Sequence, residues 1–166
     1  MDSPLEVKLC ADFPELFRDR RVCECDNGWE PLIRGLCDVL MWPTVNARTT
    51  ATSDWAKKIY TPDRLVELEA EAARLAAAIP RVLQVKEKFG MLRFYVTGAN
   101  DEQFTAINTV ESLSTRVCEM CGVMQHTRTW KMHWHKTLCF SHAVQRYGIC
   151  AIRDYVLHKP LEQILP

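Results

Sequence analysis

Four residues near the C-terminal end of the chain have the spacing of a metal site. The stretch CEMC, residues 118–121, is followed after seventeen residues by CFSH, residues 139–142. Two cysteines separated by two residues bind one ion from a tight turn, and a second pair completes the tetrahedral, sulfur-rich shell that zinc prefers. A shell of four protein ligands has no open position for catalysis. We therefore predict a structural Zn²⁺ held by Cys118, Cys121, Cys139 and His142.

The segment between the two pairs, residues 122–138, is long enough for a two-stranded hairpin. We predict strands at 127–132 and 133–138, and a helix at 141–147 whose first turn carries the last two ligands. This order of elements over residues 116–146 resembles the treble-clef family of zinc folds, and a rubredoxin-like or ribbon arrangement is the alternative. Treble clefs serve protein interaction, nucleic-acid binding and catalysis, so the resemblance implies a fold without selecting a function.

The charge balance argues against a strong overall field. The chain of 166 residues has 21 basic and 21 acidic side chains, although residues 1–30 lean acidic while 81–93 and 116–136 lean basic. The sequence starts without the basic and apolar pattern of a signal peptide, and no apolar run has the length of a membrane span. We therefore expect a cytoplasmic protein without a membrane partner.

In the cytoplasm, clustered cysteines bind metal more often than they form disulfides. The cysteines outside the cluster are then expected to be free thiols: Cys10, Cys23, Cys25, Cys37 and Cys150. Because Cys37 and Cys150 have apolar neighbours in the sequence, we expect both to pack as small hydrophobes.

Hydrophobic periodicity predicts helices on both sides of a polar segment in the first half of the chain. The first helix begins at Asp26 or Asn27 and ends at Trp42, because Pro43 disfavours the helical conformation in the residue before it. The segment 43–60 is predicted to be an exposed loop, because residues 44–60 are polar, rich in threonine and without hydrophobic periodicity. A second helix, 61–79, opens on a threonine cap and a proline.

The second half of the body contains a β-hairpin and a third helix. Residues 82–89 and 91–97 alternate in polarity or are rich in branched and aromatic residues, and Gly90 marks the turn between them. The third helix, 102–114, is expected to bury Phe104, Ile107, Val110 and Leu113. The predicted fold class is therefore α+β, a hairpin-centred antiparallel sheet packed by helices. Its domains are a body at 1–115 and, packed on it as one unit, a zinc module with C-terminal helices at 116–166.

Two further stretches carry a resemblance to a family. They are CDNGWEPLI at 25–33, followed by LC at 36–37, and QVKEKFGMLRFYV at 84–96. Together with the cysteine motif they resemble small, largely uncharacterised zinc-binding proteins of bacteriophages and prophages, from whose pattern Asn27 and Met91 depart. The resemblance implies an intracellular protein of a mobile element, and it implies no catalytic residue.

Basic and aromatic residues form the second set of candidate binding residues. Lys86, Lys88 and Arg93 are expected to project from one side of the hairpin, where they attract phosphates or an acidic partner or form a solvated outer face. In the metal module, basic and aromatic side chains suit stacking on bases or a protein-binding face. The candidates there are Trp130, Lys131, His133 and His135, with the two histidines expected on one face of a strand.

Three classes of function follow from these features. The first is a non-enzymatic, zinc-stabilised binding protein of a phage or mobile element that acts on a host protein, for example to inhibit defence or modulate transcription. The alternative is a nucleic-acid-binding regulator that uses the basic and aromatic hairpins, against which the zero net charge counts. The third is a metal-dependent nuclease-like enzyme, although no Gly-rich phosphate loop, nucleophile elbow or open metal triad appears in the sequence.

Overall fold

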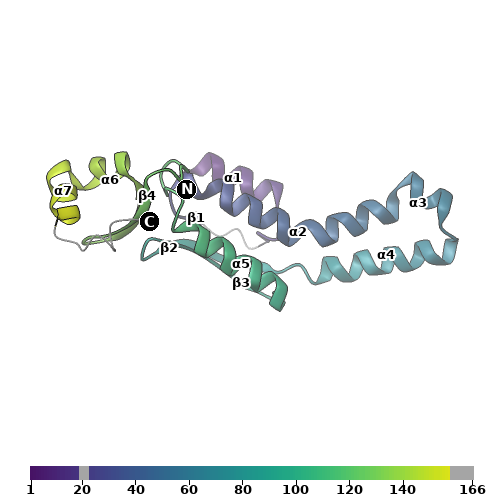
Figure 1. The fold of residues 1–166 in the computed structure, drawn as a ribbon. Helices are drawn as coiled ribbons and strands as arrows, with labels where there is room; N and C mark the ends of the chain where they lie inside the picture. Colours follow the sequence, from purple (N-terminus) through teal and green to yellow (C-terminus); the bar gives the residue numbers. More distant parts are fainter. Residues whose placement is uncertain (19–22, 158–166) are drawn as a thin grey trace.

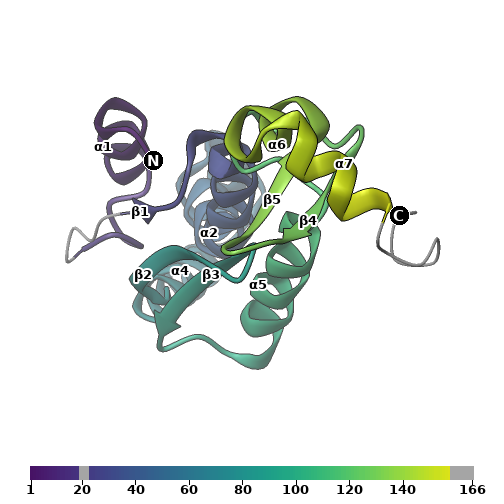
Figure 2. The same ribbon diagram turned by 90° about the vertical axis from the view of Figure 1, so that its left-hand side faces the viewer.

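The computed structural model describes residues 1–18 and 23–157, and the predicted α+β fold class is confirmed. The molecule is elongated, with a long helical arm at one end and the C-terminal helices at the other (Figure 1). Figure 2 views it from the end that carries the C-terminal helices. The helices are α1 (Ser3–Asp12), a 3-10 turn at Asn27–Trp29, α2 (Glu30–Thr52), α3 (Asp54–Ile59), α4 (Pro62–Ala77), α5 (Asp101–Ser114), α6 (Phe140–Tyr147) and α7 (Ile149–Leu157). The strands are β1 (Cys23–Glu24), β2 (Arg81–Lys88), β3 (Met91–Thr97), β4 (Thr127–Lys131) and β5 (His135–Cys139).

The central sheet has the order β1-β2-β3, with β1 parallel and β3 antiparallel to β2. The predicted hairpin is confirmed, and its two-residue turn places Phe89 and Gly90 at φ +55° and +77°. Positive φ at both central residues is the geometry of a type I′ turn. One face of the hairpin carries Val85, Leu92 and Phe94 into the main core. That core also contains residues of α1, α2 and α5.

Helix α5 closes the open edge of β3 with polar side chains. The backbone N–H of Leu92 donates to Ser114 Oγ at 2.9 Å, and the N–H of Phe94 donates to Glu111 Oε1 at 2.8 Å. The helix is capped as expected by Asn100, in a reciprocal capping box with Gln103. Its buried face differs from the prediction.

On α5, Ile107, Glu111 and Ser114 are the buried residues, while Phe104 and Leu113 are 44% and 43% exposed. The prediction that Phe104 and Leu113 are buried was wrong. Toward the end of α5 the buried positions are Glu111 and Ser114, which accept from the edge amides of β3. A sheet edge with unpaired N–H groups is costly when covered by a helix. The inward face of α5 therefore combines apolar packing with hydrogen-bond acceptors.

The predicted loop at 44–60 is helical, so the expectation of an exposed loop was wrong. Helix α2 continues through Pro43 to Thr52, and α3 follows after Ser53, whose hydroxyl accepts from the N–H of Ala56 at 3.1 Å. Proline inside a helix costs one hydrogen bond. Packing against α4 offsets that cost, since Thr44 and Ala51 are buried on the far side of the proline.

Helix α4 runs back beside α2 to form the arm, which extends away from both sheets (Figure 1). It begins as predicted, with Thr61 Oγ1 accepting from the N–H of Arg64 at 3.4 Å. Helix α1 and strand β1 were not predicted. Within the part of the chain that the structure describes, no helix has both the length and the apolar character needed to span a bilayer.

Candidate metal centre

The C-terminal hairpin is built from β4 and β5, which pair antiparallel from Thr127 opposite Cys139 to Lys131 opposite His135. The predicted strands at 127–132 and 133–138 are thus present with slightly different ends. Helix α6 begins directly after β5, and Cys139 is its N-cap residue. This places Cys139 and His142 on the first turn of a helix, facing the turn that carries Cys118 and Cys121.

The four predicted ligands lie together. Their ligand atoms all lie within 4.8 Å of one another. His142 Nδ1 is 3.5 Å from Cys118 Sγ and 3.2 Å from Cys139 Sγ, and the sulfurs of Cys121 and Cys139 are 4.0 Å apart. A tetrahedral zinc with Zn–S of about 2.3 Å and Zn–N of about 2.1 Å would separate its ligand atoms by about 3.6–3.8 Å. The donor set and its spacing therefore fit a four-coordinate metal.

The pKa values of the thiols depend on burial, on backbone hydrogen bonds and on the neighbouring thiols. Burial raises the pKa of Cys118, but hydrogen bonds from the backbone N–H groups of Cys139, Cys121 and Met120 outweigh it and lower the pKa to about 7. Burial raises the pKa of Cys121 to about 11, and the neighbouring Cys118 and Cys139 add to the rise. Adjacent thiolates repel, so their joint ionisation requires a bound cation.

The metal-binding turn rests on the segment that precedes α2. The N–H of Gly28 donates to the carbonyl of Glu119 at 2.7 Å, and Trp29 Nε1 donates to the carbonyl of Val117 at 2.8 Å. A Cβ at position 28 would lie 2.2 Å from the carbonyl oxygen of Cys118. Glycine at this position therefore allows two backbone segments to touch, and the glycine-tryptophan pair anchors the metal module to the body.

A buried charge cluster joins the same turn to both hairpins. Glu119 lies between the first two ligands and is fully buried, and both of its carboxylate oxygens accept from Lys136 Nζ at 2.8 Å. Glu87 on β2 approaches the same ammonium at 3.2 Å. Burial raises the pKa of Glu119 in spite of the lysine. The cluster holds two carboxylates and one cation, so Lys136 is the charge on which both acids depend.

The turn of the first hairpin contacts the second hairpin directly. Glu87 Oε1 accepts from the N–H of Gly90 at 2.7 Å, and the hydroxyl of Thr137 donates to the carbonyl of Gly90 at 2.5 Å. A Cβ on Gly90 would lie 2.5 Å from Thr129 Cγ2. Both stretches that carried the family resemblance, 25–33 and 84–96, thus converge on the metal module. Gly28 and Gly90 in these stretches allow close contacts with the metal module, and Glu87 binds the amide of Gly90 and the ammonium of Lys136.

The other candidate residues of the metal module are dispersed. Trp130 is 1% exposed and donates from Nε1 to the carbonyl of Leu138 at 2.9 Å, so the expectation that it lies on a binding surface was wrong. It fills the small core under α6 and α7. Lys131 is exposed at the end of β4.

The two histidines of this hairpin do not share a strand face, which corrects the prediction. His133 lies in the turn between β4 and β5, and His135 opens β5, with its ring 6.1 Å from the ring of Phe89. Neither belongs to the metal-ligand cluster.

Lys86, Lys88 and Arg93 lie on one face of the first hairpin. Lys86 is paired with Arg93 in the β2–β3 register, and Lys88 lies two residues further along β2. Arg93 also donates from Nη1 to Glu111 Oε2 at 2.7 Å. This outer face of the sheet is the side that does not enter the main core.

The cysteines outside the cluster form no disulfide. Burial raises the pKa of Cys23 and of Cys25 to about 12, and Cys37 is completely buried as expected. Cys150 is exposed, so its predicted packing as a small hydrophobe was wrong. Buried protonated thiols of this kind are inert packing groups rather than nucleophiles.

Sequence reasoning missed the buried ion pair of Glu119 and Lys136, and it counted Lys136 among the cations of the nucleic-acid-binding alternative. From the sequence, a glutamate between two cysteines is expected to be exposed. Glu119 is buried only because of its position in the tertiary structure. The sole signal was its place inside the tight metal-binding turn. No family model, curated protein or solved structure matches the chain. The geometry of the site therefore carries the functional argument alone.

Proposed function

We propose that the chain is a non-enzymatic, zinc-stabilised binding protein of a phage or mobile element and that it acts on a host protein, for example to inhibit a defence system or to modulate transcription. In this proposal Cys118, Cys121, Cys139 and His142 hold one structural Zn²⁺ in a treble-clef-like module located in the cytoplasm. Their sulfur-rich donor set supports zinc, and four protein ligands leave no position for a substrate or water. The proposed role of the ion is to hold the turn on which the segment before α2 and both hairpins meet.

The observation that carries the binding role is the arm formed by α2, α3 and α4. It exposes large apolar side chains, with Trp42 65%, Trp55 57%, Ile59 58% and Val66 64% exposed. The rings of Trp55 and Tyr60 pack edge to face, at 5.7 Å between centroids. Tryptophan is enriched at the energetic centres of protein interfaces, and the arm exposes two tryptophans, Trp42 on α2 and Trp55 on α3.

Affinity capture from a bacterial lysate tests the proposal. The wild-type chain is expected to retain one protein at a one-to-one ratio, and the W42A/W55A variant is expected to lose it. Trp134→Ala is the matched control, because Trp134 is 75% exposed but lies on the turn of the metal hairpin. Equal capture by wild type and W42A/W55A would contradict a role for the arm. Metal analysis that found no zinc in folded protein would contradict the structural metal.

A further inference from the structure

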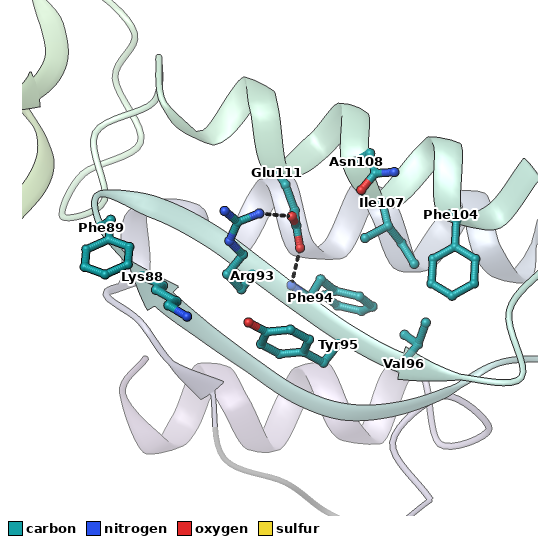
Figure 3. A pocket seen from close by; sticks show the side chains of 10 residues that line it. All are labelled: Lys88, Phe89, Arg93, Phe94, Tyr95, Val96, Phe104, Ile107, Asn108 and Glu111. Atoms are coloured by element: carbon teal, nitrogen blue, oxygen red, sulfur yellow. Dashed lines mark hydrogen bonds and ion pairs between the residues drawn. The ribbon is translucent and has the colours of Figure 1, made fainter. Parts of the chain in front are cut away.

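A groove runs between β3 and α5 on the open side of the central sheet (Figure 3). It has a volume of about 420 Å³, and the buried side chains of Phe94 and Ile107 form its floor. Its walls combine two chemistries: aromatic side chains from both elements and cationic side chains from the hairpin. The residues used in the argument are Lys88, Arg93, Tyr95, Phe104, Asn108 and Glu111.

The charge of this groove is positive. Glu111 is 8% exposed, and its two oxygens already accept from Arg93 Nη1 and from the N–H of Phe94. The remaining N–H groups of Arg93 belong to a side chain that is 35% exposed. Among residues 1–18 and 23–157, neither Lys86 nor Lys88 forms an ion pair. An anion at the rim would therefore meet cations without a competing free carboxylate from Glu111.

Aromatic rings stand beside these cations. Tyr95 is 39% and Phe104 44% exposed, on opposite sides of the groove. Lys86 Nζ lies 5.3 Å from the centre of the Tyr95 ring, and Lys88 Nζ lies 5.6 Å from the centre of the Phe89 ring. Partly exposed rings interleaved with lysines form the usual platform for a stacked base and its phosphate. The exposed amide of Asn108 adds a hydrogen-bond donor and an acceptor at the wall.

We propose that this groove binds a nucleobase together with its phosphate, with the base against Tyr95 and Phe104. The phosphate would lie at Lys88 and Arg93, which line the groove, and at Lys86, which is not part of the lining but lies beside Tyr95. The same chemistry is offered by a free nucleotide and by a single-stranded nucleic acid. The site is separate from the metal centre and from the arm. Its existence is therefore independent of the protein partner proposed for the arm.

Binding measurements on the zinc-loaded chain test the proposal. Fluorescein-labelled oligo(dT) and oligo(U) report strand binding by anisotropy, and AMP and UMP titrated by calorimetry report free-nucleotide binding. Tight binding of the oligonucleotides with weak binding of AMP and UMP assigns the site to a strand, and comparable affinity assigns it to a nucleotide. Absence of binding to all four ligands would overturn the proposal.

Two variants identify the groove as the site. K86Q/K88Q is expected to weaken binding at least tenfold and to reduce the slope of log affinity against log salt by about 1.4, since each single-strand phosphate contact contributes about 0.7. The matched control is K57Q/K58Q on α3, which is expected to change affinity less than twofold. Equal losses in the two variants would place binding outside the groove.

Substitutions of Tyr95 test the stacking contact separately from the charge contacts. Tyr95→Leu is expected to weaken binding about 5- to 150-fold, whereas Tyr95→Phe keeps the ring and is expected to keep the affinity. Equal affinity of wild type and Tyr95→Leu would overturn the stacked geometry. A polyglutamate peptide that displaces the oligonucleotide at equal charge concentration would show that charge alone is recognised, which also overturns the proposal.

Discussion

The backbone N–H of Gly28 lies 2.7 Å from the carbonyl oxygen of Glu119 and donates to it. Gly28 precedes helix α2 in the body, whereas Glu119 lies inside the turn that carries the first two metal ligands. The contact is made between main chains, so any side chain at position 28 would separate them. The stability of the metal-binding turn and that of the body are therefore coupled at this point.

Gly28→Ala is expected to lower the free energy of unfolding by about 1–3 kcal/mol or more, the usual cost of overpacking. The new Cβ would lie 2.2 Å from the Cys118 carbonyl oxygen and 2.5 Å from the Gly122 nitrogen, and backbone atoms have no rotamer by which to move away. Urea denaturation followed by circular dichroism measures the change. Gly35→Ala is the control, because no atom lies within 4 Å of a Cβ there and α2 should gain about 0.5–1 kcal/mol. Equal effects at both positions would contradict the close contact.

Cys118→Ser is expected to abolish retention of one zinc per chain. Structural zinc sites of this size contribute about 10–16 kcal/mol of binding free energy, so amides of β4 and β5 should lose protection from hydrogen exchange. Amides of α4 in the arm should keep theirs. Cys150→Ser, an exposed cysteine outside the cluster, should leave both zinc content and exchange unchanged. Full protection of β4 and β5 in metal-free Cys118→Ser would show that the ion does not hold the hairpin.

Lys136→Met is expected to lower the free energy of unfolding by about 3–5 kcal/mol, because it leaves the buried carboxylate of Glu119 without its cation. The double variant E119Q/K136M should recover part of this loss, since a neutral amide is cheaper to bury. Denaturation of the wild type and both variants measures the difference. Arg64→Met removes an exposed partner of Glu67 and should leave the stability unchanged.

The same lysine variant should show a characteristic pH dependence. Burial raises the pKa of Glu119, so the native state binds the proton more tightly than the unfolded chain does. Above the native pKa, the buried carboxylate is ionised and lowers the free energy of unfolding. As the pH falls through the native pKa, the carboxylate is protonated and this loss of stability decreases. The deficit of Lys136→Met relative to wild type should therefore shrink as the pH is lowered from neutral toward the ordinary pKa of a glutamate, about 4.3. E119Q/K136M lacks the titrating group, and a similar recovery in that variant would assign the effect to another residue.

Ser114→Ala is expected to lower the free energy of unfolding by about 1–3 kcal/mol, since it leaves the buried N–H of Leu92 without an acceptor. Ser112 lies on the exposed side of the same helix, so Ser112→Ala is a matched control with the same change in helix propensity. Thermal denaturation of the two variants gives the comparison. A smaller loss in Ser114→Ala than in Ser112→Ala would mean that α5 does not close the edge of β3.

Local signals predicted the helices and strands with strong caps or turns. Thr61 and Pro62 mark the start of α4, and Gly90 marks the hairpin turn, because each acts on the backbone of its immediate neighbours. Pro43 is the counterexample. Its local effect predicts the end of a helix, but burial of Thr44 and Ala51 against α4 continues α2 to Thr52, about two and a half turns further. Packing between distant segments outweighed a local preference.

The sequence alone was enough to predict which four residues meet. The spacing of the cysteines and the histidine determines this, because ligands separated by two residues must share a turn. Which side chains surround them was decided by tertiary structure alone. Glu119, Lys136 and Glu87 lie far apart in the chain, and only the docking of two hairpins on one turn brings their charges together. Spacing constrains neighbours along the backbone, whereas burial depends on segments that the chain folds against.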